Sequence, residues 1–488
     1  MGKPLTTPPK GSRDFLPRDV RQRTYVTDII RSVFQSHGFA PLETPAFERL
    51  DTLLGKYGEE GDQLLFKILV RGEPLVAAVR QAHDYLGQPG ALVRGRSGET
   101  APGAEPMLAD LGLRYDLTVP LARVVAAYQG KLPSIFKRYQ IQPVWRADTP
   151  GKGRFREFYQ CDVDIVGSTS KVVEAEVVGA AAECLRRLGF TEFKLRLNHR
   201  GLLRAIVEHC GIAPSSEGDA IVAIDKLDKI GPDGVEKELA ARGIAPEAAS
   251  RLLAVMADGK SLPAVKAALV TSERAQTAIA EIESVLDFAS VTAAHEHLTF
   301  DVTLARGLGY YTGCIFEIAV ADLAGSLGGG GRYDGLVGMF LGKDVPACGF
   351  SLGLERILVV MEERGMYPRD LQRVDAVIAP VEERDMKAAL RFAEQLRAVV
   401  GGAQGGAVAG AASGLCIDLL PKGMQPGKLR KHADEQEVPA ALWLEAGATE
   451  RVSLWTKRDG QTRKELSVQE ALTVLRAHRS AAAIATQA

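Results

Sequence analysis

Three arginines stand in contexts that suit the binding of a polyanion: Arg146, Arg306 and Arg356. Each lies beside glycine or aromatic residues, in a stretch that otherwise has strand or helix character. A guanidinium group matches phosphate oxygens through paired hydrogen bonds, and glycine lets a ligand approach the backbone closely. Any one of them alone would more often form a structural ion pair, but the recurrence of three favours a phosphate clamp.

The sequence contains neither a P-loop nor a dinucleotide-binding fingerprint, although Gly328–Gly331 form a glycine cluster. Its six cysteines lie far apart and form no C-x-x-C pair, which argues against a zinc site and against a disulfide framework. We therefore expect no dedicated metal cage of protein ligands and a reducing, cytoplasmic location. No Ser/His/Asp or Cys/His arrangement stands out either.

The first of these arginines lies between two predicted strands. Residues 135–146 and 158–167 are rich in β-branched and aromatic residues at near-alternating positions. The connection DTPGKGRFRE between them has the Pro and Gly of a hairpin. Before them, residues 17–37 place apolar side chains at helical spacing, and Gly38 follows as a stop signal.

The other two arginines belong to a second set of predicted elements. Strand character returns at 299–320, and ACGFSLGLERILVVMEE is typical of a strand-to-helix passage that ends near residue 364. Between the two sets, residues 200–292 are helical in pattern and poor in aromatic residues, as expected of an inserted module. Residues 369–373 are typical of a linker. Residues 374–488 alternate strand and helix patterns, which predicts a small α/β domain.

Length and composition limit the function classes. The 488 residues suffice for two to four domains at roughly 150 residues each. With 46% apolar and 25% charged residues, the chain is not globally disordered. Its formal net charge is −1, so nucleic-acid binding must use local patches, such as the seven cations against two acids from Lys131 to Gln160. The uncharged stretch 398–417 is too rich in Gly and Ala for a membrane span and predicts a flexible loop, and the N-terminus lacks the apolar core of a secretory signal.

In the order of its motifs the chain resembles the histidyl-tRNA synthetases, a family of class II aminoacyl-tRNA synthetases. The motifs are PKGSRDFLP (9–17), GFAPLETPAFERLDTLLGKYGEEGD (38–62), LRYDLTVPLAR (113–123), VWRADTPGKGRFREFYQCDVDI (144–165) and ACGFSLGLERI (347–357). Those class motifs alone are loose. Two further segments, ARGLGYYTG (305–313) and GGGGRYDGL (328–336), resemble histidine-specific signatures and stand in the right order.

The resemblance implies an α+β catalytic domain with an antiparallel sheet flanked by helices. This domain would comprise residues 1–199 and 293–368, interrupted by the helical insertion, with an anticodon-binding domain at 374–488. The implied activity is that of a histidine–tRNA ligase, which activates L-histidine with ATP to histidyl-adenylate and transfers it to the 3′ end of tRNA(His). It implies ATP with Mg²⁺ and no other cofactor, a homodimer whose interface includes the 38–62 motif, and no membrane partner.

By motif match the resemblance also assigns roles to single residues. Arg146 is expected to hold the α-phosphate, Arg306 the α-phosphate or the histidine carboxylate, and Arg356 the γ-phosphate. The histidine-binding set comprises Asp116, Thr118 and Gln160 for the ammonium, Asp164 and Tyr311 for the imidazole, with Tyr310 and Arg306. The ATP-binding set comprises Arg146, Arg154, Phe158, Gly353 and Arg356, and the tRNA-contacting cations are Lys152, Lys428, Arg430 and Lys431.

Three features depart from the family pattern. Gly309 replaces an often acidic residue in RGLDYY, the loop RADTPGKGR replaces the RRERP type, and residues 68–112 exceed the family's short link.

Two other functions are compatible with parts of this pattern. A regulatory subunit of ATP phosphoribosyltransferase would resemble the catalytic core, but such paralogues generally lose the arginine of RGLxYY and lack the anticodon-binding domain. This chain keeps Arg306 and has 115 residues after residue 373. A class II synthetase for another amino acid is disfavoured by the two histidine signatures.

Overall fold

The computed structural model describes residues 6–86, 108–258, 261–305, 309–323, 325–368, 371, 374–398 and 415–485. The chain divides into two units: residues 1–14 with 29–364, and residues 15–28 with 365–488. The division falls inside the first helix, α1 (Pro17–Ser36). Each unit is described by itself.

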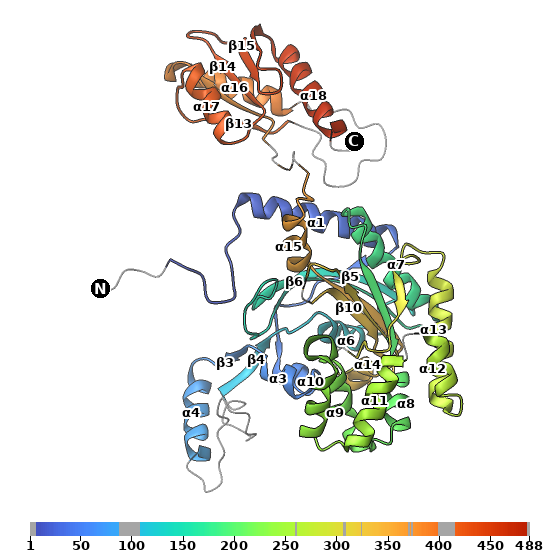
Figure 1. The fold of residues 1–488 in the computed structure, drawn as a ribbon. Coiled ribbons are helices and arrows are strands. Elements are labelled where there is room, and N and C mark those ends of the chain that lie inside the picture. Colours follow the sequence, from blue (N-terminus) through green and yellow to red (C-terminus); the bar gives the residue numbers. More distant parts are fainter. Residues whose placement is uncertain are drawn as a thin grey trace. The chain divides into compact units, whose positions relative to one another are not determined.

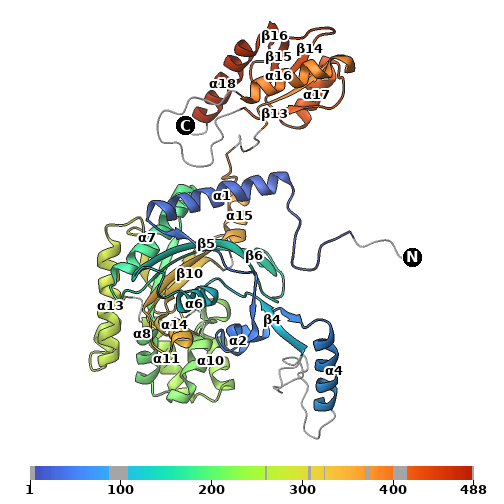
Figure 2. The same ribbon diagram turned by 180° about the vertical axis from the view of Figure 1, so that it is seen from behind.

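The first unit is built on an eight-stranded sheet (Figures 1 and 2). In spatial order its strands are β1 (Ala40–Pro41), β5 (Phe136–Trp145), β6 (Glu157–Val166), β11 (Ala347–Gly353), β10 (Ser326–Arg332), β9 (Cys314–Ala319), β7 (Lys194–His199) and β8 (Leu298–Phe300). The inner pairs are antiparallel, and only the edge pairs β1–β5 and β7–β8 are parallel. This is the antiparallel, helix-flanked catalytic sheet that the resemblance implied.

The two faces of the sheet differ in chemistry because alternate residues of a strand point to opposite faces. On one face, Cys161 and Val163 of β6 are fully buried, and Tyr139 of β5 packs against Phe34 of α1 with ring centroids 6.1 Å apart. Helix α7 (Val172–Arg187) packs against β6 and β11 as well. The other face of β6 carries polar residues and faces the candidate site.

A smaller sheet and short helices adjoin the large sheet. The small sheet has the order β2 (Phe47–Arg49), β4 (Ala109–Leu113), β3 (Lys67–Leu69), and the helices are α2 (Leu50–Leu53), α3 (Gly58–Gln63), α4 (Glu73–Leu86), α6 (Thr118–Ala127), α14 (Asp334–Leu341) and α15 (Leu354–Glu363). A buried cluster that includes Leu53, Val119 and Leu336 holds several of these elements together. Arg114 donates to the backbone oxygens of Thr44 and Pro45 and to Gln142 of β5, so it ties the end of β4 to the large sheet.

Helices occupy the chain between β7 and β8. They are α8 (Arg200–His209), the 3₁₀ turn η1 (Pro214–Ser216), α9 (Glu217–Ile224), α10 (Leu227–Ala241), α11 (Pro246–Asp258), α12 (Leu262–Ala268) and α13 (Glu273–Ala289). Ser261 and Ser272 cap the last two, each accepting a backbone N–H three residues ahead. Helix α13 packs against α7 and α8 and contacts β7 and β8, so the last helix of this region lies next to the large sheet.

The second unit contains a five-stranded sheet covered on both faces. The strand order is β13 (Ile417–Leu419), β12 (Ala376–Pro380), β14 (Ala440–Leu444), β15 (Val452–Thr456) and β16 (Thr462–Leu466), and the helical segments are η2 (Glu383–Asp385), α16 (Met386–Ala398), α17 (Pro426–Glu435) and α18 (Val468–Ala485). Helices α16 and α18 contribute to one buried cluster and α17 to another. Within the described residues, no helix is both long and apolar enough to cross a membrane.

The strands predicted at 135–146 and 158–167 are present as β5 and β6, and the helix predicted at 17–37 is α1. The continuous strand character expected over 299–320 is wrong in its middle, where turns at 302–303 and 309–310 separate β8 from β9. Glycines in this stretch favour turns, and Asn198 holds the backbone oxygens of Val302 and Leu304. Most of the uncharged stretch 398–417 lies outside the described residues, and the proposed domain boundaries stay a prediction.

Candidate active site

A cavity of about 290 Å³ opens over the polar face of the large sheet. It brings together residues from the loop between β5 and β6, from β6, β9, β10 and β11, and from α6 and α15, which are far apart in the sequence. Ten of the predicted histidine- or ATP-binding residues line it: Asp116, Thr118, Arg146, Arg154, Phe158, Gln160, Tyr310, Tyr311, Gly353 and Arg356. Such a concave site with a few convergent polar groups is the usual form of a small-molecule site.

Asp116 lies at one wall of the cavity and is only 1% exposed. The hydroxyls of Tyr57 and Tyr310 donate to its two oxygens, each at 3.2 Å, and the backbone N–H of Val119 donates at 3.0 Å. Burial raises the pKa of this carboxyl, while the Val119 hydrogen bond and the charge of Arg146 oppose that rise. A ligand cation at this wall would favour the ionised form.

Arg146 reaches the cavity from the end of β5. Its Nε donates to the backbone oxygen of Tyr115 at 3.1 Å. The guanidinium carbon lies 4.2 Å from the ring centre of Tyr115 and 5.2 Å from that of Phe158. Two aromatic neighbours and a backbone acceptor therefore fix the direction of this cation, as a phosphate-binding arginine requires.

Arg356 enters the cavity from α15, one turn after the end of β11. It donates to the backbone oxygen of Ser326 at 2.6 Å and to that of Gly153 at 3.4 Å. Gly153 belongs to the loop between β5 and β6, so this arginine connects that loop to β10. Its charge also faces the cavity, where an anion would meet it.

Glu355, beside it, fixes the start of β6. Its carboxylate accepts the backbone N–H of Tyr159 at 2.9 Å and lies 3.7 Å from Arg13. Residues from the N-terminal segment, β6 and α15 thus meet at one edge of the cavity.

Asp164 lies behind the cavity lining, with 2% of its surface exposed. Arg138, which is fully buried, approaches one oxygen at 2.8 Å, and the hydroxyl of Tyr333 donates to the other. Space for this carboxylate depends on Gly349 of β11, since a Cβ there would stand 1.9 Å from Oδ1. Tyr311 lines the cavity and rests against Gly331, whose missing side chain leaves room for the ring.

The remaining predicted residues lie elsewhere. Arg306 is outside the described residues. Lys152 is exposed and forms an ion pair with Glu363 at 2.8 Å. Lys428, Arg430 and Lys431 lie on α17 of the second unit, where the Arg430 guanidinium is 5.7 Å from the ring centre of Trp443.

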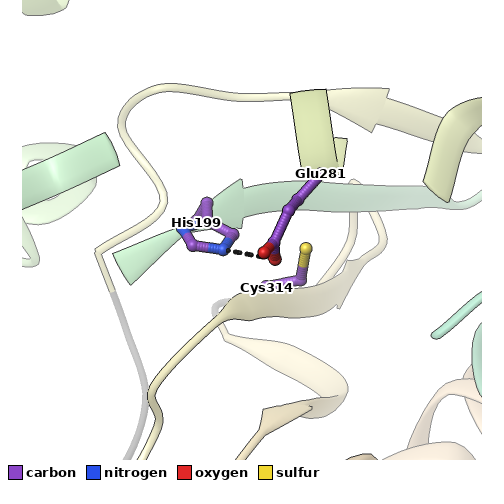
Figure 3. A group of neighbouring side chains, drawn as sticks. All are labelled: His199, Glu281 and Cys314. Atoms are coloured by element: carbon purple, nitrogen blue, oxygen red, sulfur yellow. Dashed lines mark hydrogen bonds and ion pairs between the residues drawn. The ribbon is translucent and has the colours of Figure 1, made fainter. Parts of the chain in front are cut away.

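A second group of side chains has donor atoms close enough together to suggest a metal site: His199, Glu281 and Cys314 (Figure 3). His199 accepts the backbone N–H of Gly201 at Nδ1, so its Nε2 carries the proton and faces Glu281 at 3.1 Å. The same Glu281 oxygen lies 2.6 Å from Lys171, and these contacts hold the pKa of Glu281 down at about 2. The arrangement is satisfied as an ion-pair network that joins α13 to the end of β7.

Sequence reasoning missed several residues of the cavity and its support. Tyr57 and Tyr333 hold carboxylates through hydroxyls that come from distant segments, and Glu317, Ser351 and Glu355 line the cavity. The serine and the glutamates lie inside the recognised segments or in strands. Serine and glutamate are common residues, so their identity alone does not mark a site. The alternation Gln160, Asp162, Asp164 was the available signal, because it places three polar residues on one face of a buried strand.

The match to a known family settles what this cavity belongs to. The family model described as histidyl-tRNA synthetase matches residues 11–78 and 107–357. The chain belongs to the histidyl-tRNA synthetase family. Residues 79–106, which the family model leaves unmatched, fall within the 68–112 stretch that exceeds the usual link.

Curated relatives agree over most of the chain. A histidine–tRNA ligase of Gloeobacter violaceus is 43% identical over 389 residues, which cover 75% of this chain and 78% of the relative. One of Christiangramia forsetii is 39% identical over 439 residues and covers 88% of this chain and 90% of the relative. The histidyl-tRNA synthetase family thus extends to relatives that align across both units.

Solved structures have the same fold. A crystal structure of histidyl-tRNA synthetase from Nostoc sp. PCC 7120 has a TM-score of 0.74 at 27% identity, covering 98% of this chain and all of that one. A Bacillus halodurans structure titled as an ATP phosphoribosyltransferase regulatory subunit/histidyl-tRNA synthetase has a TM-score of 0.68 at 21% identity, and that likeness concerns the fold alone.

Proposed function

We propose that this chain is a histidine–tRNA ligase, which joins L-histidine to tRNA(His) at the cost of ATP. The observation that carries the proposal is the single cavity that gathers an ammonium-binding wall around Asp116 and two fixed cations, Arg146 and Arg356. The curated relatives, which carry the name histidine–tRNA ligase, support the same activity. ATP, L-histidine and tRNA(His) are its substrates.

The wall around Asp116 is assigned to the histidine ammonium, together with Thr118 and Gln160. An ammonium offers three N–H donors, and these three side chains offer oxygens. Asp164 and Tyr311 are assigned to the imidazole, with Tyr310 at the side. A buried carboxylate near an imidazole N–H would reject apolar isosteres, because they would leave the charge unpaired.

Activation is in-line attack of the histidine carboxylate on the α-phosphorus of ATP, with pyrophosphate as the leaving group. Such a reaction needs alignment and positive charge more than a protein nucleophile. Arg146 is assigned to the α-phosphate, Arg356 to the γ-phosphate, and Arg306 to the α-phosphate or the histidine carboxylate. Arg154, Phe158 and Gly353 complete the proposed ATP site.

Mg²⁺ is proposed as the ion that accompanies ATP, bound mainly by phosphate oxygens and water, as this ion prefers. Four carboxylates line the cavity: Asp116, Asp148, Glu317 and Glu355. Asp116 accepts the two tyrosine hydroxyls, and Asp148 lies 3.9 Å from Arg154. Glu317 lies 3.2 Å from Arg196, and Glu355 accepts the Tyr159 N–H at 2.9 Å. These carboxylates fit an ion that is bound through the phosphate oxygens of ATP better than an ion bound by protein ligands alone. When bound, the ion would neutralise charge on the polyphosphate.

The broader assignments complete the proposal. The sheet unit would carry catalysis, with the helices at 200–292 as an insertion, and the region 374–488 would bind the anticodon. Lys152, Lys428, Arg430 and Lys431 would contact tRNA phosphates, where cations supply affinity without sequence choice. The enzyme would act as a homodimer in the cytoplasm.

The test of this proposal is ATP–pyrophosphate exchange with purified protein and Mg²⁺, comparing L-histidine with the other amino acids before any tRNA is added. We expect exchange with histidine alone. A folded protein that binds histidine but shows no exchange would contradict the proposal and indicate the regulatory subunit. Exchange with a different amino acid would indicate another class II specificity.

A further inference from the structure

Gln160 and Ser351 line the cavity, and Asp162 lies beside them on the same face of the sheet. In the ladder between β6 and β11, Asp162 stands opposite Ser351, and Gln160 stands opposite Gly353, two residues further along. Gln160 and Asp162 point to the same face because they are two residues apart in one strand. Ser351 therefore has Asp162 directly across from it and Gln160 on the diagonal.

The hydrogen bonds among the three run in one direction. Ser351 faces Asp162 across the ladder, and a hydrogen bond from its hydroxyl lowers the pKa of that carboxyl, which in its ionised form can only accept. The Ser351 hydroxyl has a single proton, and that proton is used on Asp162. Its contact with Gln160, at 2.8 Å, must therefore be a bond in which the amide N–H₂ donates to the serine oxygen.

This direction fixes which end of the Gln160 amide faces away from the serine. With Nε2 held by Ser351, the carbonyl Oε1 is the opposite end. Gln160 is 9% exposed, and among the residues that the structure describes Oε1 is buried without a hydrogen-bond partner. An unpaired buried acceptor costs free energy unless a ligand supplies a donor.

The donor that suits this position is an ammonium. Gln160 lines the same cavity as Asp116 and Thr118, and a reversed amide would present N–H₂ to the ligand instead of oxygen. Two N–H donors facing an ammonium could not bond to it. The sense of the amide therefore decides whether Gln160 attracts or opposes the α-ammonium of the substrate.

We propose that Asp162 and Ser351 are positioning residues, which set the Gln160 amide so that its oxygen faces the ammonium of the amino-acid substrate. We call the three residues the Asp162–Ser351–Gln160 relay. This inference rests on the proposed function, since it takes the amino acid of the cavity to be histidine. Neither Asp162 nor Ser351 needs to touch the substrate.

The test removes the relay and compares ligands that differ in the ammonium. Ser351→Ala and, separately, Asp162→Asn are made in the full-length protein, and binding is measured by calorimetry for three ligands. L-Histidine has both charged groups, L-histidinol keeps the ammonium but lacks the carboxylate, and imidazole-4-propionate keeps the carboxylate but lacks the ammonium. Ser290→Ala, at the end of α13, is the matched serine-to-alanine control.

We expect each relay variant to weaken histidine and histidinol by about tenfold or more, the usual scale for a lost hydrogen bond to a charged group. Imidazole-4-propionate should change less than about twofold, and the KM for ATP should stay at the wild-type value. Equal weakening of all three ligands would show a merely structural role and overturn the inference. So would unchanged binding of all three by both variants.

The failure of the proposed function would look different. In that case the wild-type protein itself would show no histidine-dependent exchange, whatever the variants did. A wild-type enzyme that exchanges normally, with relay variants that show no ammonium-selective loss, would overturn the relay alone.

Discussion

At the residue scale, the charge of Asp162 governs the candidate histidine site. Burial raises the pKa of this carboxyl to about 7, the Arg138 charge lowers it, and the charge of Asp164 adds to the rise. The groups around it are Arg138 and Gln140 on β5, Asp164 on β6 and Ser351 on β11. The charge of Asp116 also raises the pKa of Asp162, and the charge of Asp162 raises the pKa of Tyr311. The carboxyl therefore titrates within the range in which the enzyme can be assayed.

The relay requires ionised Asp162, so affinity for histidine should fall in acid. Once protonated, Asp162 can donate to Ser351, which frees the serine proton for Gln160 Oε1 and lets the amide reverse. We expect the KM for histidine to rise between about pH 8 and pH 6, and to rise less in Ser351→Ala, which has no relay to reverse. The measurement is the KM for histidine in pyrophosphate exchange at several pH values, with the KM for ATP as control.

Titration of the substrate imidazole affects both proteins equally, so the comparison isolates Asp162. Parallel pH profiles in wild type and Ser351→Ala would contradict the prediction. The free energy of unfolding depends on pH in the opposite direction to histidine affinity. A carboxyl whose pKa is raised by folding binds its proton more tightly in the folded state than in the unfolded state. The folded protein therefore loses that contribution as the pH rises from about 4 towards 7.

Gly349 makes a second prediction at the scale of single residues. A Cβ at this position would stand 1.9 Å from Oδ1 of Asp164, so Gly349→Ala must displace a carboxylate that Arg138 and Tyr333 hold. We expect a loss of about 1–3 kcal/mol in the free energy of unfolding, the usual cost of overpacking, and a higher KM for histidine. Denaturant unfolding and exchange kinetics would measure both.

Gly335→Ala provides the control for that substitution. Gly335 lies in α14, where the nearest atom to an added Cβ is 3.9 Å away, and alanine is the better helix former. We expect this variant to be at least as stable as the wild type. Wild-type stability and KM in Gly349→Ala would disprove the tight fit around Asp164.

At the scale of elements, the N-terminal segment acts on the loop between β5 and β6. The backbone oxygen of Gly11 accepts the Arg156 N–H at 2.7 Å, and Arg13 lies over the Phe155 ring at 3.3 Å. Arg356 holds the same loop at a second point, through the backbone oxygen of Gly153. Two segments that are distant in the sequence thus hold the loop whose residues line the proposed ATP site.

Gly11→Ala should disturb this clamp. Gly11 has a φ of +89°, a conformation that alanine rarely adopts, and its Cβ would stand 2.7 Å from the Arg156 side chain. We expect the KM for ATP to rise by roughly threefold or more, because a displaced loop weakens binding without removing a ligand-binding group. The KM for histidine should stay near the wild-type value. A selective effect on histidine would place the action of the segment elsewhere.

The sequence predicted the elements better than the contacts between them. Strands β5 and β6 follow from alternating β-branched and aromatic residues, a local property of the chain. The broken stretch between β8 and β9 was not foreseen, because β-branched and aromatic residues surround the turns there. Likewise Asp116 and Gln160 were identified from their motifs, whereas Ser351 and Tyr57 were not. Their importance arises from partners in other segments, which a single sequence does not display.

At the scale of the whole molecule, charge separates the two proposed tasks. The formal net charge is only −1, so the proposed attraction for tRNA rests on local cations such as those on α17. Lys428 and Lys431 lie in the second unit, whereas every residue of the cavity lies in the first. Amino-acid activation and tRNA affinity should therefore respond to different substitutions.

The double variant Lys428→Ala with Lys431→Ala tests this separation. We expect aminoacylation to weaken by about tenfold in kcat/KM for tRNA, with a salt dependence shallower by about two charges, while histidine-dependent exchange is unchanged. Glu435→Ala, which removes the acidic neighbour 3.7 Å from Lys431, is the control and should not weaken charging. Unchanged aminoacylation in the double variant would mean that α17 lies outside the tRNA-binding surface.

The hydrogen bond between Asp162 and Ser351 also limits which substitutions we expect at these two positions among members of the family. Loss of either residue alone leaves a buried polar group misdirected or unpaired, and loss of both leaves the Gln160 amide without the hydrogen bond that sets its direction. Relatives that keep Gln160 should therefore keep Asp162 and Ser351 together. Positions 162 and 351 are separated in the sequence by the whole helical insertion and by strands β7 to β10, yet we expect them to evolve together.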